Sequence, residues 1–469
     1  MKTPLRAEVA PAPAALLTAR LDRLPGSRHL WGLVLCLALG GFFEMFDLFL
    51  TGYVGPLLLH SGIFHPGSRD RFGLSDQAFF AAATFAGLFV GALVFSSVAD
   101  RWGRRPVFTY SLLGYTAATL LMATQTSAWG LELWRFVGGI GIGLELVTID
   151  AYLSELVPKH LRVRAFAVCT GVQFLAIPTV AWLCWFFSDR NPAGLAGWRW
   201  VLLCSAAGAG AIWILRARLP ESPRWLIRRG RLAEAERVTA AIEARVEAEV
   251  GHALPAPVPG SEPAVEPGGP LPGIWQPPYR RRTIMLCVFN FFQTIGFYGF
   301  GNWLPQLLAA QGATVLQSLH YAFIIAIAYP LTPLLLLPIA GRFEPKWQVV
   351  TAAAGIAGFG LLFAQERTAA TLIACGVLVT ASNCCLSYAF HAYQAELFPT
   401  RIRARAVGFC YSWSRLSTVF NSFMIAFFLK HFGAPGVFAF IAASMLAVIV
   451  AIGGFGPRTR GLALEAISR

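Results

Sequence analysis

Six charged side chains and one histidine lie inside long apolar stretches of this sequence. They are Glu44, Asp47, Arg135, Glu145, Asp150, Arg415 and His391. An ionised side chain at the centre of a membrane costs roughly 2.5 to 3.5 kcal/mol on insertion scales. Such residues line solute paths, relay protons or form ion pairs, so these seven are the first candidates for chemistry.

Two of these charges are at similar depths in the membrane. Asp47 lies eleven residues, about 16 Å, from the outer end of its apolar stretch, and Arg135 lies seven residues, about 10 Å, into a stretch that starts outside. Glu44, Asp47 and Thr51 share one helix face at i, i+3 and i+7 spacing. We expect Asp47 and Arg135 to meet, either as a proton-coupling pair with Glu44 nearby or as a permanent structural ion pair.

Arg415 is the strongest candidate for contact with a solute. It lies about 16 Å from the cytoplasmic end of its helix, and that helix carries no obvious acid to neutralise it. Its planar guanidinium suits a carboxylate, although pairing with Glu145 or Asp150 is the alternative. His391 falls where the first half of the chain has Asp150 (391 − 150 = 241), so it pairs with an acid, relays protons or is structural. The candidate solute-binding residues are Arg415, Gln293, Asn290, Tyr388, Glu145, Asp150 and His391.

The elements that position these residues are apolar helices. The 469 residues are 56% hydrophobic and 13% charged, which is too apolar for a soluble protein of this size. About 20 apolar residues cross a bilayer. Twelve such stretches are present, at 29–58, 77–99, 106–125, 128–157, 163–187, 197–217, 282–309, 317–340, 347–365, 369–398, 404–428 and 433–453. We therefore predict an all-α membrane protein with twelve transmembrane helices.

The net charge of +14 comes from Lys and Arg clustered in alternate connections. This positive-inside pattern places both termini in the cytoplasm, and it does not gather a basic face for nucleic acid. The absence of N-x-S/T sites favours a bacterial inner membrane. One long connection, 218–281, contains a helical pattern at 231–250 followed by a Pro/Gly-rich tether.

The two halves repeat one another. Residues 152–162 and 393–403 both fit Y-x-x-E-x-x-P-x-x-x-R, and FFE at 42–44 and Pro56 align with FFQ at 291–293 and Pro305. Two similar units imply pseudo-symmetric six-helix bundles with the solute site between them. The predicted organisation is a tail (1–28), an N-terminal bundle (29–217), a linker with an amphipathic helix (218–281), a C-terminal bundle (282–453) and a second tail (454–469).

Several motifs resemble those of the major facilitator superfamily, in its sugar-porter and organic-ion branch. Residues 100–105 (DRWGRR) match its D-R-x-G-R-R loop, 135–143 (RFVGGIGIG) match R-x-x-x-G-x-G-x-G, and 220–226 (PESPRWL) match a branch signature. The resemblance implies the major facilitator fold, proton coupling through Asp47 and Arg135, and an anion site at Arg415. Close helix packing explains Gly139, Gly141 and Gly143 better than a dinucleotide loop does.

Charged residues also meet at the cytoplasmic helix junctions, where opposite charges can bridge helices in one state and part in another, or simply fix topology. This candidate gate comprises Asp100, Arg101, Arg104, Arg105, Glu155, Arg162, Glu221, Arg224, Glu396 and Arg403.

These features predict a proton-coupled symporter of a small organic anion, such as a mono- or aromatic carboxylate, working by alternating access. The missing Gln-Gln pair in the seventh span counts against the alternative of a sugar or polyol porter, and the short C-terminal tail counts against a transport-fold nutrient sensor. The sequence shows no metal cluster, nucleophile triad or phosphate loop that would predict an enzyme. We expect a monomer in the lipid bilayer that takes a small-molecule solute and protons as partners and needs no cofactor.

Overall fold

The computed structural model of the protein describes residues 13–67, 74–94, 98, 101–216, 219–257, 273–277, 279–336, 343–398 and 400–459. In these residues all regular structure is helical. Eleven helices in this part of the chain are long and apolar enough to cross a membrane. The last of these helices contains two spans.

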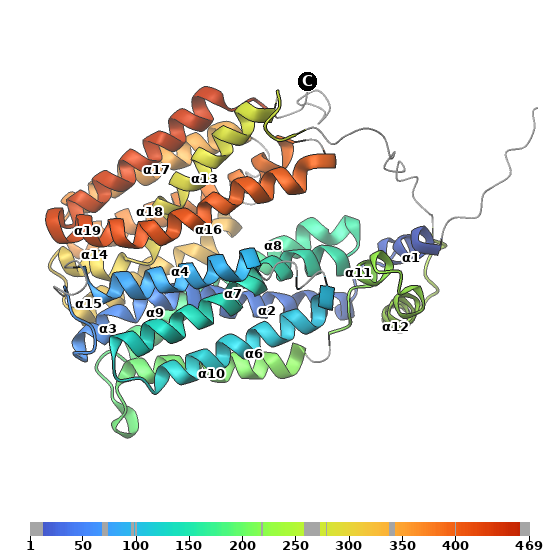
Figure 1. Cartoon of the computed structure of the whole chain (residues 1–469), viewed down its shortest axis with the longest axis horizontal. Helices are drawn as coiled ribbons and strands as arrows, with labels where there is room; N and C mark the ends of the chain where they lie inside the picture. Colours follow the sequence, from blue (N-terminus) through green and yellow to red (C-terminus); the bar gives the residue numbers. More distant parts are fainter. Residues whose placement is uncertain are drawn as a thin grey trace, which may run out of the picture.

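Helix α19 (Thr400–Phe455) has 56 residues and contains Gly433 in a non-helical conformation, with φ 64° and ψ −165°. A straight helix of this length would measure about 84 Å, far more than the roughly 30 Å of a bilayer core. Gly433 therefore joins two spans, and the chain doubles back there (Figure 1). With this division the helices give the twelve spans that the sequence predicts.

The remaining spans follow in order along the two halves. In the N-terminal half they are α2 (Arg28–Tyr53), α4 (Asp76–Val94), α6 (Arg104–Ala123), α7 (Ala128–Leu156), α8 (Arg162–Phe174) with α9 (Ala176–Phe186), and α10 (Gly197–Arg216). In the C-terminal half they are α13 (Tyr279–Gly301), α15 (Val315–Ala326) with α16 (Ala328–Leu336), α17 (Pro345–Gln365) and α18 (Ala369–Glu396).

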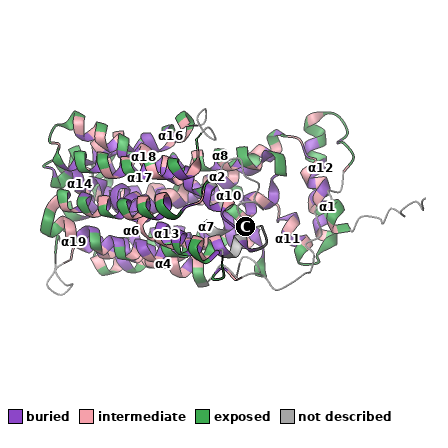
Figure 2. Cartoon of the chain, turned by 90° about the horizontal axis from the view of Figure 1, so that it is seen from above, coloured by how far each residue is buried: buried purple, intermediate pink, exposed green. Residues whose placement is uncertain are grey.

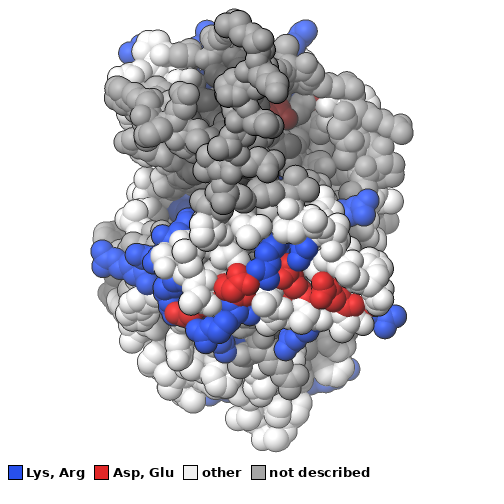
Figure 3. All heavy atoms as spheres, turned by 90° about the vertical axis from the view of Figure 1, so that its right-hand side faces the viewer, with Lys and Arg blue, Asp and Glu red and all other residues white. Residues whose placement is uncertain are grey.

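Shorter helices lie at the two ends of these spans. At one end, to the right in Figures 1 and 2, are α1 (Pro13–Asp22), α11 (Pro223–Arg228) and α12 (Leu232–Val250). We name this the charged end, because Lys, Arg, Asp and Glu side chains gather on it (Figure 3). Helix α12 coincides with the helical pattern at 231–250, whereas α1 lies inside the stretch 1–28 that was predicted to be only a tail.

The sequence repeat reappears as matching helix breaks. Span α2 ends at Tyr53 and is followed by α3 (Gly55–His60), with Pro56 in its first turn. Span α13 ends at Gly301 and is followed by α14 (Leu304–Ala310), with Pro305 in its first turn. Because proline has no backbone N–H to continue the preceding helix, equivalent prolines end equivalent spans.

At the end opposite the charged end, the two halves are in close contact. A Cβ atom at Gly52 of α2 would lie 1.8 Å from the carbonyl oxygen of Asn302, so only glycine permits this approach. The Gln306 side-chain amide donates a hydrogen bond of 3.0 Å to the Gly52 carbonyl oxygen. The structure is therefore closed between the halves at this end.

Glycines also set the distance between α4 and α7. Cβ atoms at Gly139 and Gly143 would lie 2.5 and 2.2 Å from the carbonyl oxygens of Thr84 and Leu88. In the other direction, a Cβ atom at Gly87 of α4 would lie 2.1 Å from the Phe136 carbonyl oxygen. The close helix packing predicted for the glycine motif is confirmed, and it places Arg135, one turn before Gly139, against α4.

Candidate functional site

Asp47 and Arg135 meet inside the N-terminal half, as their depths predicted. Nη1 of Arg135 lies 3.5 Å from Oδ1 of Asp47, and the two side chains are 2% and 1% exposed. The pair joins α2 to α7.

The Arg135 guanidinium makes most of its hydrogen bonds to other groups. Its Nε donates to the hydroxyls of Thr51 and Thr84 at 3.1 and 3.0 Å, and its Nη2 donates to the backbone carbonyl of Asp47. The two hydroxyls are 3.2 Å apart. Gln77 donates to the Thr51 carbonyl at 2.7 Å and fixes this turn of α2.

The Asp47 carboxylate is bound much more loosely than its partner. Neither of its oxygens has a hydrogen-bond partner, although both are buried. Arg135 is therefore held by neutral groups that remain when the charge on Asp47 changes, while the carboxylate depends on the charge of Arg135 alone.

Glu44 lies one turn from Asp47 and is 3% exposed. Its Oε1 is buried without a hydrogen-bond partner. Its charge interactions reach Glu145, Asp150 and Arg216 of its own half and Arg415 of the other half. Glu44 is thus a carboxylate whose charge interactions reach across the two halves.

Glu145 was predicted to be a solute-binding residue or a partner of Arg415. It forms an ion pair with Arg216, and both side chains are completely buried. Arg216 also donates to the Phe108 carbonyl at 2.7 Å, and its guanidinium carbon lies 3.6 Å from the centre of the Phe108 ring. The predicted alternative pairing of Glu145 with Arg415 is therefore wrong, and the carboxylate is enclosed by protein.

Arg216 is a site residue that the sequence analysis missed. It stands at the last position of α10, where a basic residue is usually read as a flank that fixes topology. The one available signal was Gly40 on α2: a Cβ there would lie 1.8 Å from Nη2 of Arg216, so the glycine makes room for the guanidinium.

Arg415 lies in the first half of α19 and is 6% exposed. Its Nη2 is 3.3 Å from the Tyr411 hydroxyl, and its guanidinium carbon lies 5.0 Å from the centre of the Tyr411 ring. Among the described residues, no acid lies within ion-pair distance of it. Glu44, Asp150 and Tyr298 are its other electrostatic neighbours. The structure thus contains a buried cation that is compensated only at longer range.

The remaining predicted solute residues differ in the exposure of their side chains. Asp150, Tyr388 and His391 are exposed, Gln293 is half-buried, and Asn290 is buried. Asp150 interacts electrostatically with His391 and Arg415, which lie on the other half. Asn290 donates to the Leu286 carbonyl at 2.9 Å and leaves its own oxygen unpaired.

Several predicted gate residues join helices at the charged end. Arg104 and Arg228 both bind the Glu155 carboxylate, the former at 3.2 Å. The Glu221 carboxylate accepts backbone N–H groups of Arg104 and Arg105 at 3.0 and 3.2 Å. Burial raises the pKa of Glu221 despite these hydrogen bonds. These contacts connect α6 and α7 to the segment around α11.

The other predicted gate residues are less connected to one another. Arg224 pairs with Asp22 of α1 at 2.6 Å, and Arg162 donates to the Val157 carbonyl at 3.3 Å. Arg101 is exposed, and Glu396 keeps a buried oxygen without a hydrogen bond. Asp100 lies outside the described residues, as does the side chain of Arg403.

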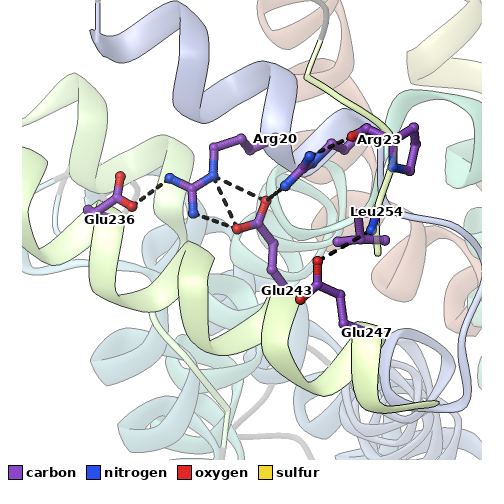
Figure 4. A network of polar contacts seen from close by, with 7 residues as sticks. Arg20, Arg23, Glu236, Glu243, Glu247 and Leu254 are labelled. Carbon is purple, nitrogen blue, oxygen red and sulfur yellow. Dashed lines mark hydrogen bonds and ion pairs between the residues drawn. The ribbon is translucent and has the colours of Figure 1, made fainter. Parts of the chain in front are cut away.

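A further ion-pair network fastens α1 to α12 (Figure 4). Arg20 binds Glu236 and Glu243, each at 2.5 Å, and Arg23 binds Glu243 at 2.7 Å. Burial alone would raise the pKa of Glu243, but the hydrogen bonds and charges of Arg20 and Arg23 outweigh it and lower that pKa. The same contact with Glu243 raises the pKa of Arg20.

In the described part of the chain, no three His, Cys, Asp or Glu side chains are grouped so that they could hold a metal ion.

Comparison with known proteins defines the family. Residues 33–469 match the family described as "Sugar (and other) transporter". The putative metabolite transport protein YyaJ of Bacillus subtilis is 32% identical over 94% of this chain and 95% of its own length. The chain therefore belongs to the sugar transporter family of the major facilitator superfamily, and it is an integral membrane transporter.

Other relatives differ in what their names say they carry. The niacin transporter NiaP of Acinetobacter baylyi is 26% identical, over 96% of this chain and 99% of its own length. The 4-hydroxybenzoate transporter PcaK of the same organism is 26% identical, over 88% of this chain and 87% of its own length. The partially occluded inward-open structure of the xylose transporter XylE from E. coli has a TM-score of 0.74 at 18% identity and covers 93% of this chain and 100% of that one, which supports the fold alone.

Proposed function

We propose that this transporter is a proton-coupled symporter of a small organic anion, with Arg415 as the carboxylate-binding residue. The observation that carries this proposal is a buried guanidinium between the two halves with no acid at ion-pair distance among the described residues. An incoming carboxylate would supply the missing charge through two parallel hydrogen bonds.

Aromatic residues near Arg415 favour a flat solute. Tyr411 lies against the guanidinium, and Tyr298 packs edge-on against Phe85 of the other half with ring centres 5.0 Å apart. Niacin and 4-hydroxybenzoate, named for two of the relatives, are both aromatic monocarboxylates. The preferred substrate class is therefore an aromatic or small monocarboxylate.

Proton coupling is assigned to Asp47, with Arg135 as its counter-charge and Glu44 as the carboxylate closer to the solute. Loading a proton on Asp47 removes its attraction to Arg135, while Thr51 and Thr84 keep the guanidinium in place. This changes the charge balance between α2 and α7, and rocking of the halves then exposes the proton to the other side. By the positive-inside rule, the charged end faces the cytoplasm of a bacterial inner membrane.

Uptake into proteoliposomes with an acidic exterior tests this proposal. Labelled 4-hydroxybenzoate and niacin should accumulate, whereas xylose should not. The R415Q variant should raise the KM for the carboxylates at least about tenfold, because it loses one charge-assisted contact. The control variant R280Q replaces an exposed arginine at the charged end of α13 and should leave the KM unchanged.

The D47N variant separates coupling from binding. It should abolish accumulation driven by the pH gradient and retain exchange of labelled for unlabelled solute. Carboxylate uptake that ignores the gradient in the parent protein would overturn the coupling proposal, and an unchanged KM in R415Q would overturn the anion site.

A sugar or polyol porter is the second candidate function. The buried Asn290 side chain keeps an unpaired oxygen that a hydroxyl could satisfy after a small movement. Accumulation of xylose, with no effect of R415Q, would favour this alternative.

A further inference from the structure

Two adjoining grooves lie where the charged end meets the spans. The first, of about 370 Å³, is bordered by α12, the segment before α11 and the first turns of α2 and α6. The second, of about 300 Å³, runs between α2 and α10. His29 and Arg245 line both, so the two grooves are next to each other. We name them the basic groove and the apolar groove.

The basic groove is lined by a surplus of cations. Its charged lining residues are His29, Arg105, Glu221, Glu234, Arg237 and Arg245. Glu221 is occupied by backbone N–H groups, and Glu234 pairs with Arg231 at 2.6 Å. The hydrogen bonds and the ion pair of these two acids are therefore made with groups other than Arg237 and Arg245.

Apart from Glu234, the acids of α12 are not among the residues that line this groove. Glu236 and Glu243 bind Arg20 of α1, and Glu243 also binds Arg23, as Figure 4 shows. Glu247 accepts the backbone N–H of Leu254 at 3.3 Å, and Glu249 accepts that of His29 at 3.2 Å.

Two arginines of α12, Arg237 and Arg245, line the basic groove. Both side chains are exposed, and neither forms an ion pair with a described residue. They are eight residues apart, or about 12 Å along the helix, so they share one face at i and i+8.

The apolar groove lies on the lipid-facing surface of two spans. Leu35 of α2 and Leu215 of α10 are 46% and 44% exposed. Gly32 is exposed at the groove, and a Cβ there would meet no atom within 4 Å. The apolar groove on two membrane spans lies next to the basic groove. This pair of surfaces suits the two parts of a phospholipid, a hydrocarbon chain joined to a phosphate.

We propose that the two grooves together bind one anionic phospholipid. Arg237 and Arg245 hold the headgroup phosphate, and one acyl chain lies along Gly32, Leu35 and Leu215. Phosphate and guanidinium form charge-assisted hydrogen bonds, and basic pockets next to spans recognise anionic headgroups. The lipid would brace α12. This site does not depend on which solute the protein carries.

Native mass spectrometry of the purified full chain in detergent tests the proposal, with dioleoyl phosphatidylglycerol, dioleoyl phosphatidylcholine and inorganic phosphate as probes. One phosphatidylglycerol should remain bound at concentrations where phosphatidylcholine does not. The double variant R237Q/R245Q should bind it about 25-fold more weakly, because each basic residue near a membrane surface contributes about a factor of 5. The variant R280Q, which removes an exposed charge from α13, should bind as the parent does.

A second substitution separates a lipid from a free anion. G32W fills the apolar groove and should weaken phosphatidylglycerol binding at least about fivefold. The control G114W changes an exposed glycine of α6, where an added Cβ would meet no atom within 4 Å, and it should not weaken binding. Equal binding by R237Q/R245Q and the parent would overturn the proposal. So would competition by millimolar phosphate combined with no effect of G32W, because the site would then be one for a soluble anion. An equal loss in R280Q would reduce the effect to general surface charge and would also overturn it.

Discussion

Replacing Arg216 by methionine leaves the Glu145 carboxylate inside the N-terminal half without its counter-charge. Both side chains are completely buried, and Oε2 of Glu145 already lacks a hydrogen-bond partner. Removing one member of such a pair costs about 3–5 kcal/mol, because the other charge stays buried. In a unit of roughly 200 residues, each kcal/mol of lost stability lowers the melting temperature by about 2–4 °C. R216M should therefore lower the melting temperature by roughly 6–20 °C.

The reciprocal change should cost less. In E145L, Arg216 keeps its hydrogen bond to the Phe108 carbonyl and its contact with the Phe108 ring. It also stands at the end of α10, from which a long side chain can reach toward water. The double variant E145L/R216M replaces the pair by apolar groups of similar volume, and it should melt close to the parent, because neither charge is then left alone.

Thermal unfolding in detergent, followed by intrinsic fluorescence, completes this double-mutant cycle. The coupling between positions 145 and 216 should be at least about 3 kcal/mol. As a matched control, R199M removes an arginine at the other end of α10 that binds the carbonyls of Ala123 and Gln125. Its effect should add to that of E145L without coupling. Additive effects of E145L and R216M would refute the reasoning, since they would mean that the two charges are solvated independently.

Three further predictions concern helix contacts and pH. Gly139→Ala places a Cβ near the Thr84 carbonyl and should destabilise the protein by about 1–3 kcal/mol, measured by melting temperature, with an unchanged value contradicting the close packing. The pKa of Glu243 is lowered in the folded protein, so its stabilisation of α1 is present above the ordinary value of 4.5 and is lost as the pH falls through the lowered value. Spin labels at Leu16 and Ala240 should therefore show one narrow distance at pH 7 and a broad distribution near pH 3, and identical distributions would contradict this. The E243Q variant should broaden the distribution already at pH 7, and a narrow distribution there would count against the ion pairs.

Apolar runs and their lengths were enough to predict the spans, because a bilayer requires about 20 apolar residues whatever their partners. Depth could be predicted as well: a helix rises a fixed distance per residue, so Asp47 and Arg135 could be matched before their helices were placed. The repeat predicted equivalent breaks at Pro56 and Pro305, because proline acts locally. The glycine motif predicted close packing, although it did not identify α4 as the partner.

The partners of Glu145 and Arg415 could not be predicted in the same way. Both were assigned to the solute path, Arg415 because of its depth and because its own helix carries no obvious acid. In the structure Glu145 pairs with Arg216, whereas Arg415 has no acid at ion-pair distance among the described residues. Depth gives the position along a helix but not the direction in which a side chain points. Helix α1 was missed for a related reason. Its ten residues are too few to be stable alone, and they are held by Glu236 and Glu243 of a helix more than 200 residues away.

The sequence by itself determined that this chain is a twelve-span transporter with a charge pair at matched depth, since hydropathy, helical rise and proline act over a few residues. The tertiary structure alone decided which charges are neutralised. Electrostatic compensation depends on distances between helices that are remote in sequence, and those distances arise only when the twelve spans pack together.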